Sequence, residues 1–261
     1  MGAGLMGPGE LIRECGRAAT LRLRELLGED LVAAWLAGSG ALGGAVPGLS
    51  DVDLVAVCAG DPPDELRRAI AGRLGELALT WPVRGLEFVL YARAAVATPA
   101  RAPRFAVNLN VGPRMPYRLS LDPADEPAHW FLLDLAILRD HGRALAGPPP
   151  GELIGPIPRR WLLEALRDSM AWHQANEPVL QQSVLNASRG WRFASEGVWC
   201  SKDAAGAWAR DRTADPATVE AALALRHGDR SRPLDPALVE RFQGEALAAV
   251  ERALGPSDPG G

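Results

Sequence analysis

The residues with the clearest chemical potential lie in one stretch, residues 38–57, which reads GSGALGGAVPGLSDVDLVAV. Side chains of an extended strand alternate between two faces, so Asp51 and Asp53 project from the same side. Two neighbouring carboxylates repel each other, and the arrangement is tolerated chiefly where a cation neutralises them. Because hard oxygen ligands favour Mg²⁺, and because Mg²⁺ also takes water and phosphate oxygens, the pattern predicts a magnesium site.

A glycine-rich loop precedes these acids and contains Gly38, Ser39, Gly43 and Gly44. Backbone N–H groups without bulky side chains can approach phosphate oxygens closely. A glycine-rich turn or an Asp-x-Asp strand is, by itself, more often purely structural. The combination of the loop with a Ser-Asp-Val-Asp motif that begins at Ser50 is more specific, and it predicts nucleotide chemistry.

Two later strands add further polar candidates. Glu87 is the one charged residue in the predicted strand 86–91, so it must lie at a strand end, be paired, or have a function. Asn108 and Asn110 share one face of the predicted strand 105–111 and could reach the acceptor or the nucleotide. A solvated face of an edge strand explains these two asparagines equally well.

These residues need an α/β scaffold, and the hydrophobic pattern predicts one. We expect strands at 51–58, 86–91 and 105–111 and helices at 9–28 and 63–79. From residue 128 onward only helices are expected, at 128–145, 159–176, 179–195, 201–210, 216–227 and 235–254. We place a domain boundary in the run 146–158, which is too rich in Pro and Gly to be helical. We therefore predict an α/β domain at 1–150, a helical bundle at 151–255 and a disordered tail at 256–261.

Composition excludes several classes of protein. The formal charge is −4 and no basic cluster is visible, which argues against a nucleic-acid surface. No run approaches the ~18 apolar residues of a membrane helix, and the N-terminus has no signal-peptide pattern. The three cysteines have no metal-type spacing, so we expect a reduced, cytoplasmic protein. We also expect a monomer.

The glycine loop, the Ser-Asp-Val-Asp motif and Glu87 resemble the pattern of DNA polymerase β-type nucleotidyltransferases. The closer resemblance is to the aminoglycoside (streptomycin/spectinomycin) adenylyltransferases, and it extends nearly from end to end. Their C-terminal domain has stretches similar to DLAILRDHGRALAGP (134–148) and VLNASRGWRFASEGVWCSKDAAGAWA (184–209). This resemblance implies a small mixed sheet flanked by helices, an all-α second domain, and an interdomain cleft for ATP and substrate.

The resemblance also implies roles for individual residues. Asp51 and Asp53 match the Mg²⁺ ligands and Glu87 matches the catalytic base. The residues that match nucleotide-binding groups are Gly38, Ser39, Ser50, Arg189 and Lys202. Lys202 is the one lysine among 28 basic residues, and a lysine suits a flexible phosphate contact. Chance in an arginine-rich sequence is the alternative explanation.

The acceptor side departs from the family pattern. Members of the family that act on streptomycin and spectinomycin hold the antibiotic with carboxylates in one segment. In this chain that segment reads HQANEPVLQQS (173–183), and its one acid is Glu177. A tryptophan expected after the third strand is replaced by Val111-Gly112-Pro113. The expected reaction is transfer of AMP from ATP to a hydroxyl of a small molecule, with an aminoglycoside as the first candidate. A sugar, a protein or RNA remains an alternative acceptor, and a catalytically idle binding protein is an alternative of another class.

Overall fold

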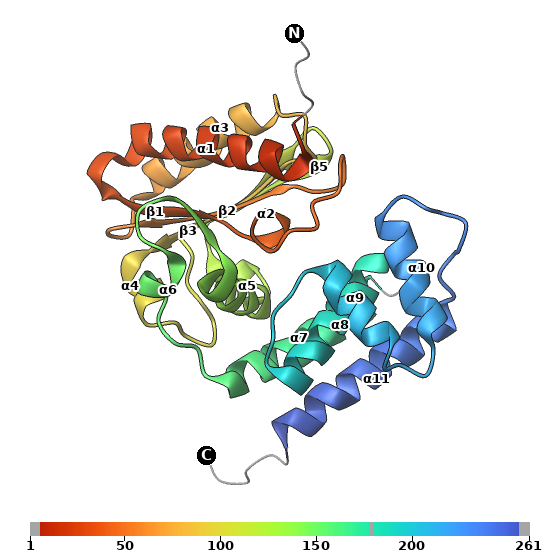
Figure 1. Cartoon of the computed structure of the whole chain (residues 1–261). Coiled ribbons are helices and arrows are strands. Elements are labelled where there is room, and N and C mark those ends of the chain that lie inside the picture. The colour runs from red at the N-terminus through yellow and green to blue at the C-terminus, as the bar shows by residue number, and fades with distance from the viewer. Residues whose placement is uncertain (1–5, 178–179, 256–261) are drawn as a thin grey trace. The chain divides into compact units, whose positions relative to one another are not determined.

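The computed structural model describes residues 6–177 and 180–255. The chain divides into two compact units, one that ends at Ile157 and one that begins at Pro158 (Figure 1). The division falls at the end of the Pro/Gly-rich run 146–158. The tail predicted for 256–261 lies outside the described residues. The domain limits at residues 150 and 255 stay predictions.

A six-stranded mixed sheet forms the centre of the first unit. Its strands are β1 (Leu31–Leu36), β2 (Val52–Cys58), β3 (Leu86–Ala92), β4 (Val107–Gly112), β5 (Met115–Ser120) and β6 (Arg143–Ala146). Their order is β5-β4-β3-β2-β1-β6. β2 and β3 are parallel, and the other neighbours are antiparallel. The predicted α/β class and mixed sheet are confirmed.

Helices cover both faces of this sheet. They are α1 (Pro8–Leu27), α2 (Gly38–Leu42), α3 (Asp64–Ala78), α4 (Arg93–Ala97), α5 (Ala128–His141) and α6 (Pro150–Leu153). α1 and α3 lie on one face, and α5 lies on the other (Figure 1). Alternating side chains of the strands feed two separate apolar clusters, one around Leu54 and Phe88 and one around Trp35 and Phe131. The second cluster is the smaller, and the polar site residues lie on its face of the sheet.

One predicted helix is shorter than expected. The helix predicted for 128–145 ends at His141, and Arg143–Ala146 instead forms β6, which pairs with β1 at the sheet edge. Gly142 leaves the helical conformation, with ψ at 146°, and a Cβ there would lie 2.6 Å from the Leu138 carbonyl oxygen. The gain is a hydrogen-bonded edge strand, which a continued helix could not provide.

The second unit contains helices only. They are α7 (Arg159–Asn176), α8 (Gln181–Glu196), α9 (Lys202–Arg210), α10 (Pro216–Arg226) and α11 (Pro236–Leu254). α8 contacts each of the other four, so it forms the centre of the bundle. Asp235 caps α11 by accepting hydrogen bonds from the N–H groups of Ala237 and Leu238. The helix predicted for 179–195 begins at Gln181; its expected first residue lies outside the described residues. The all-helical second domain is confirmed.

Within residues 6–177 and 180–255, no helix combines the length and the apolar character needed to cross a membrane.

Candidate active site

Three polar side chains stand in a row across β2, β3 and β4. Asp53 is opposite Glu87 in the parallel pair, and Glu87 is opposite Asn110 in the antiparallel pair. Directly paired residues project to the same face of a sheet, so the two carboxylates and the amide share one surface. Asn108 lies two residues away on that face, opposite Val89, and is buried. The structure thus brings together four residues that the sequence placed on three separate strands.

Asp51 joins this group from the segment just before β2, and it is held by a residue that sequence reasoning missed. Arg84 Nη1 donates a hydrogen bond to Asp51 Oδ2 at 2.5 Å and lies 3.9 Å from Glu87 Oε1. The Asp51 side chain is 16% exposed. One guanidinium therefore contacts two of the three predicted catalytic acids. Local sequence does not mark Arg84, because its place beside Ser50 depends on how β2 and β3 pair.

Glu87 has an unusual acidity for a carboxyl group. Its pKa is raised to about 8: loss of hydration is the largest cause, the negative charge of Asp51 acts in the same direction, and Arg84 opposes both. Asp134 on α5, also unforeseen as a site residue, adds to the increase. The Glu87 side chain is nevertheless 44% exposed, so a ligand can reach it. Without a bound cation, Glu87 keeps its proton through most of the neutral range.

The glycine loop packs directly against the acids. Gly38 begins α2 with a φ of 48°, and a Cβ at this position would lie 1.9 Å from Asp53 Oδ2. Only glycine accommodates both the positive φ and the contact with the carboxylate. The hydroxyl of Ser39 is buried and has no hydrogen-bond partner among the described residues. Because a buried hydroxyl without a partner is costly, Ser39 is suited to contact a ligand.

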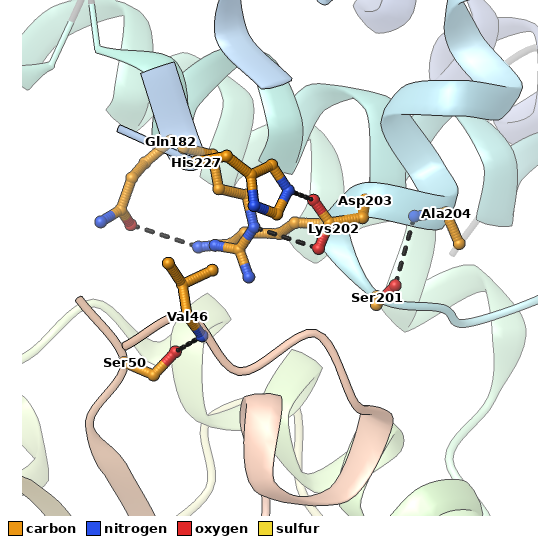
Figure 2. Close-up of polar contacts among 9 residues, drawn as sticks. Val46, Ser50, Gln182, Ser201, Lys202, Asp203, Ala204 and His227 are labelled. Carbon is orange, nitrogen blue, oxygen red and sulfur yellow. Dashed lines mark hydrogen bonds and ion pairs between the residues drawn. The ribbon is translucent and has the colours of Figure 1, made fainter. Parts of the chain in front are cut away.

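Ser50 has a structural contact of its own. Its hydroxyl accepts a hydrogen bond from the backbone N–H of Val46 at 2.9 Å, which closes the turn before the Asp-Val-Asp segment (Figure 2). Gly43 and Gly44, which precede this turn, both have positive φ. The loop is thus shaped by glycines and fastened by Ser50.

The acids fit a magnesium ion that shares its ligands with a substrate. In the described part of the chain, no set of three or more His, Cys, Asp or Glu residues is arranged to hold a metal alone. Asp51 and Asp53 supply hard oxygen donors beside a loop able to hold phosphates. Mg²⁺ is commonly bound in this way, by one or two carboxylates together with water and substrate phosphates.

The expected nucleotide-binding residues of the second unit lie on α8 and α9. Lys202 is the first residue of α9, which Ser201 caps by accepting from the Ala204 N–H. Lys202 Nζ donates to Gln182 Oε1 at 3.2 Å (Figure 2). Arg189 is half-buried on α8.

A carboxylate next to Lys202 fastens the start of α9 to the end of α10. Asp203 Oδ1 lies 2.8 Å from His227 Nε2 (Figure 2), and Asp203 Oδ2 accepts from Arg226 Nε at 3.3 Å. The position of Lys202 is therefore fixed by side-chain contacts within the second unit.

Glu177, the predicted acceptor-binding acid, belongs to a chain of polar contacts. It follows α7 directly, and its Oε2 lies 3.0 Å from His173 Nδ1. His173 Nε2 lies 3.1 Å from the Asn186 side-chain nitrogen. Burial lowers the pKa of His173, although Glu177 opposes this effect. A neutral His173 that donates from Nδ1 to Glu177 and accepts at Nε2 from Asn186 satisfies all three groups. Sequence reasoning found Glu177 but not its two partners.

Comparison with known proteins finds similarity to aminoglycoside adenylyltransferases in sequence and in fold. Residues 152–248 match the family "Aminoglycoside adenylyltransferase, C-terminal domain". Aminoglycoside (3'') (9) adenylyltransferases of Klebsiella pneumoniae and Escherichia coli are 38% identical to the chain over 87 residues. These residues make up 31% of this chain and 33% of either relative, so the alignment spans about a third of the relatives' length.

A solved structure extends the likeness of fold to nearly the whole chain. The spectinomycin adenyltransferase of Enterococcus faecialis, crystallised with ATP and spectinomycin, has a TM-score of 0.69 at 16% sequence identity. The match covers 91% of this chain and 98% of that protein. The predicted resemblance to aminoglycoside adenylyltransferases is therefore confirmed, in sequence for the C-terminal domain and in fold for both units.

Proposed function

We propose that the protein transfers AMP from ATP to a hydroxyl of an aminoglycoside-type antibiotic and releases pyrophosphate. The observation that carries this proposal is the row of Asp53 and Glu87 on paired strands, with Asp51 beside them and Gly38 packed against Asp53. Two cation-binding carboxylates, a third acid and a phosphate loop are the parts that nucleotidyl transfer needs. The match of the C-terminal domain supports the same reading.

The chain's own residues have distinct roles in this reaction. Asp51 and Asp53 hold Mg²⁺, which when bound neutralises phosphate charge and stabilises the departing pyrophosphate. The loop at Gly38 and Ser39 holds the triphosphate. Glu87 takes the proton of the acceptor hydroxyl as general base. Ser50 supports nucleotide binding by shaping the loop. Arg189 and Lys202 balance the negative charge of the phosphates with their own positive charges.

The raised pKa of Glu87 suits a base that works only in the loaded site. In the cation-free protein the carboxyl group keeps its proton, since Asp51 and the loss of hydration both disfavour its charge. Positive charge placed on Asp51 and Asp53 lowers the pKa of Glu87 again. Glu87 thus loses its proton more readily when ATP and cation are present, as a general base requires.

The acceptor is placed beside Glu87 by polar side chains of the same sheet face. Asn110 and Asn108 offer amide groups for its hydroxyls. Glu177, in the second unit, is the acid that we propose for its amines. Spectinomycin is the first acceptor to test, because the solved structure with the matching fold binds it. We place the protein in the cytoplasm, where ATP and Mg²⁺ are available.

Mass spectrometry of an antibiotic panel tests this function. Spectinomycin, streptomycin and other aminoglycosides are incubated with the protein, ATP and Mg²⁺, and at least one should gain the mass of one AMP. Asp53→Asn, assayed in parallel, should give no product. If no antibiotic gains AMP while a sugar, protein or RNA does, the chemistry stands and the acceptor class is wrong. If nothing gains AMP, the proposed transfer is wrong, and a catalytically idle binding protein becomes the hypothesis to test.

A further inference from the structure

Arg84 is fixed at the edge of the carboxylate group by its backbone. Its N–H donates to the Ser50 carbonyl at 3.4 Å, and its own carbonyl accepts from Arg114 N–H at 3.1 Å. The next residue, Gly85, is clamped against the β4–β5 hairpin: a Cβ there would lie 2.8 Å from the Val111 carbonyl oxygen. The Arg84 side chain therefore starts from a rigid position next to Asp51.

The guanidinium occupies Asp51, which is one of the two expected cation ligands. It is paired with Asp51 Oδ2 and lies 3.9 Å from Glu87 Oε1, so it contacts two acids of the same group. A divalent cation bound to Asp51 would stand close to this positive charge, and like charges at such a distance repel strongly in a partly buried site. The Arg84 side chain is 34% exposed, which leaves it a path toward solvent.

We propose that Arg84 is the resident counter-ion of Asp51 in the cation-free protein, and that its guanidinium leaves Asp51 when a divalent cation binds. This inference rests on the proposed function, because it takes Asp51 and Asp53 as the cation ligands. Arg84 neutralises Asp51 while the site is empty and makes cation binding weaker than the carboxylates alone would allow. Mg²⁺ then binds well only when nucleotide phosphates add further negative ligands, which offset the loss of the Arg84–Asp51 ion pair.

The test compares Arg84→Met with Arg114→Met, a matched control that removes the same charge from the same edge of the sheet. Arg114 is exposed, and no contact of its side chain is found in the described part of the chain. Mn²⁺ alone, without nucleotide or acceptor, is titrated and followed by electron paramagnetic resonance. Arg84→Met should bind Mn²⁺ about tenfold more tightly, the scale of one lost charged competitor, and Arg114→Met should not.

Thermal unfolding of the same variants separates this role from a structural one. Without cation, Arg84→Met should melt at a lower temperature than wild type, because Asp51 loses its partner. Saturating Mn²⁺ should restore the melting temperature to near the wild-type value, and Arg84→Lys should retain the weak Mn²⁺ binding of wild type. A purely structural arginine would lower the melting temperature equally with and without Mn²⁺.

Unchanged or weaker Mn²⁺ binding by Arg84→Met overturns the inference. Asp51→Asn, titrated in parallel, distinguishes the two levels of failure. If Asp51→Asn weakens Mn²⁺ binding but Arg84→Met has no effect, the cation site stands and only the role of Arg84 is wrong. If Asp51→Asn binds Mn²⁺ as wild type does, the cation assignment within the proposed function is wrong, and the role of Arg84 falls with it.

Discussion

The two units of the chain position their charged residues by different means. In the first unit, the hydrogen-bonded register of β2, β3 and β4 sets Asp53, Glu87 and Asn110 side by side. In the second, side-chain contacts hold each group, such as Lys202 on Gln182 and Glu177 on His173. Backbone hydrogen bonds between strands fix the positions of the site residues whatever the neighbouring side chains are. The geometry of this part of the site therefore depends on few residue types. A side-chain network depends on every member.

This difference matches where the sequence likeness lies. The family match covers 152–248, almost all of it in the second unit, while the first unit resembles the spectinomycin adenyltransferase in fold at low identity. We therefore expect substitutions of Asp53 and Glu87 in the first unit to lower the reaction rate, and those of Lys202 and Glu177 in the second to weaken binding of ATP or acceptor. The following predictions test that division, from the largest effect to the smallest.

Asp53→Asn should lower turnover on the order of 10³-fold, the scale of removing electrostatic stabilisation from a reacting centre. The amide keeps the shape that packs against Gly38, so the fold should survive, and the cation-free protein should be no less stable because carboxylate repulsion is relieved. Steady-state kinetics and thermal unfolding measure the two effects. Asp64→Asn is the control, since Asp64 is 76% exposed on α3. A variant that keeps most of its activity contradicts the cation assignment.

Glu87→Gln should lower kcat on the order of 10²-fold while ATP and Mg²⁺ still bind. The amide preserves the shape of the side chain but cannot accept the proton of the acceptor hydroxyl. Calorimetry with a non-hydrolysable ATP analogue checks binding, and Glu65→Gln, an exposed acid of α3, serves as control. Loss of nucleotide binding together with turnover would make Glu87 a cation ligand or a structural acid.

Lys202→Ala should weaken ATP binding about tenfold whichever acceptor is offered, because a charged hydrogen bond to phosphate is lost. The control is Arg210→Ala at the other end of α9, where the side chain pairs with Asp211 at the surface. Fluorescence titration with a labelled ATP analogue measures the change. An effect that varied with the acceptor would move Lys202 to the acceptor side of the reaction.

Glu177→Gln should leave ATP binding unchanged and weaken only a cationic acceptor, by roughly 1–3 kcal/mol. Because Glu177 also contacts His173, Asp168→Asn on the exposed side of α7 controls for general damage to this helix. Acceptor KM values report the outcome. Indifference of KM to Glu177→Gln would remove Glu177 from the acceptor site.

The smallest expected effect is on the pH dependence of stability in EDTA. The folded protein raises the pKa of Glu87 to about 8, so folded Glu87 holds a proton that the unfolded chain has already released. The free energy of unfolding should therefore fall as pH rises from about 5 to about 8. Melting temperatures of Glu87→Gln should lack this part of the decline. Equal slopes for wild type and variant would show that Glu87 ionises normally.

In the first unit, the sequence predicts the site residues whose position follows from strand alternation and whose chemistry is unusual for a strand. Alternation placed Asp51 and Asp53 on one face, and an acid inside an apolar strand marked Glu87. Arg84 and Asp134 were not found, because their contacts depend on strand register and on the packing of α5, neither of which local periodicity encodes. β6 was missed for the same reason: Arg143–Ala146 is too short to show a period, and only pairing with β1 makes it a strand.

The second unit was readable chiefly through resemblance. Helical periodicity predicts its helices, but no pattern in residues 173–186 predicts that His173 links Glu177 to Asn186. The i,i+4 spacing brings Glu177, the residue after α7, close to His173 in the last turn of that helix, whereas the contact with Asn186 requires α8 to pack against α7. Side-chain contacts between helices are therefore the part of a site that is hardest to predict from a single sequence.

The central claim, transfer of AMP, is tested most directly by following the label of two ATP preparations. One carries ³²P at the α-phosphate and the other at the γ-phosphate, and each is incubated with the protein, Mg²⁺ and spectinomycin. We predict that the α-label appears in the antibiotic and that the γ-label leaves in pyrophosphate. A γ-label in the antibiotic would make the protein a kinase, and an unlabelled antibiotic with both preparations would contradict its modification by this protein.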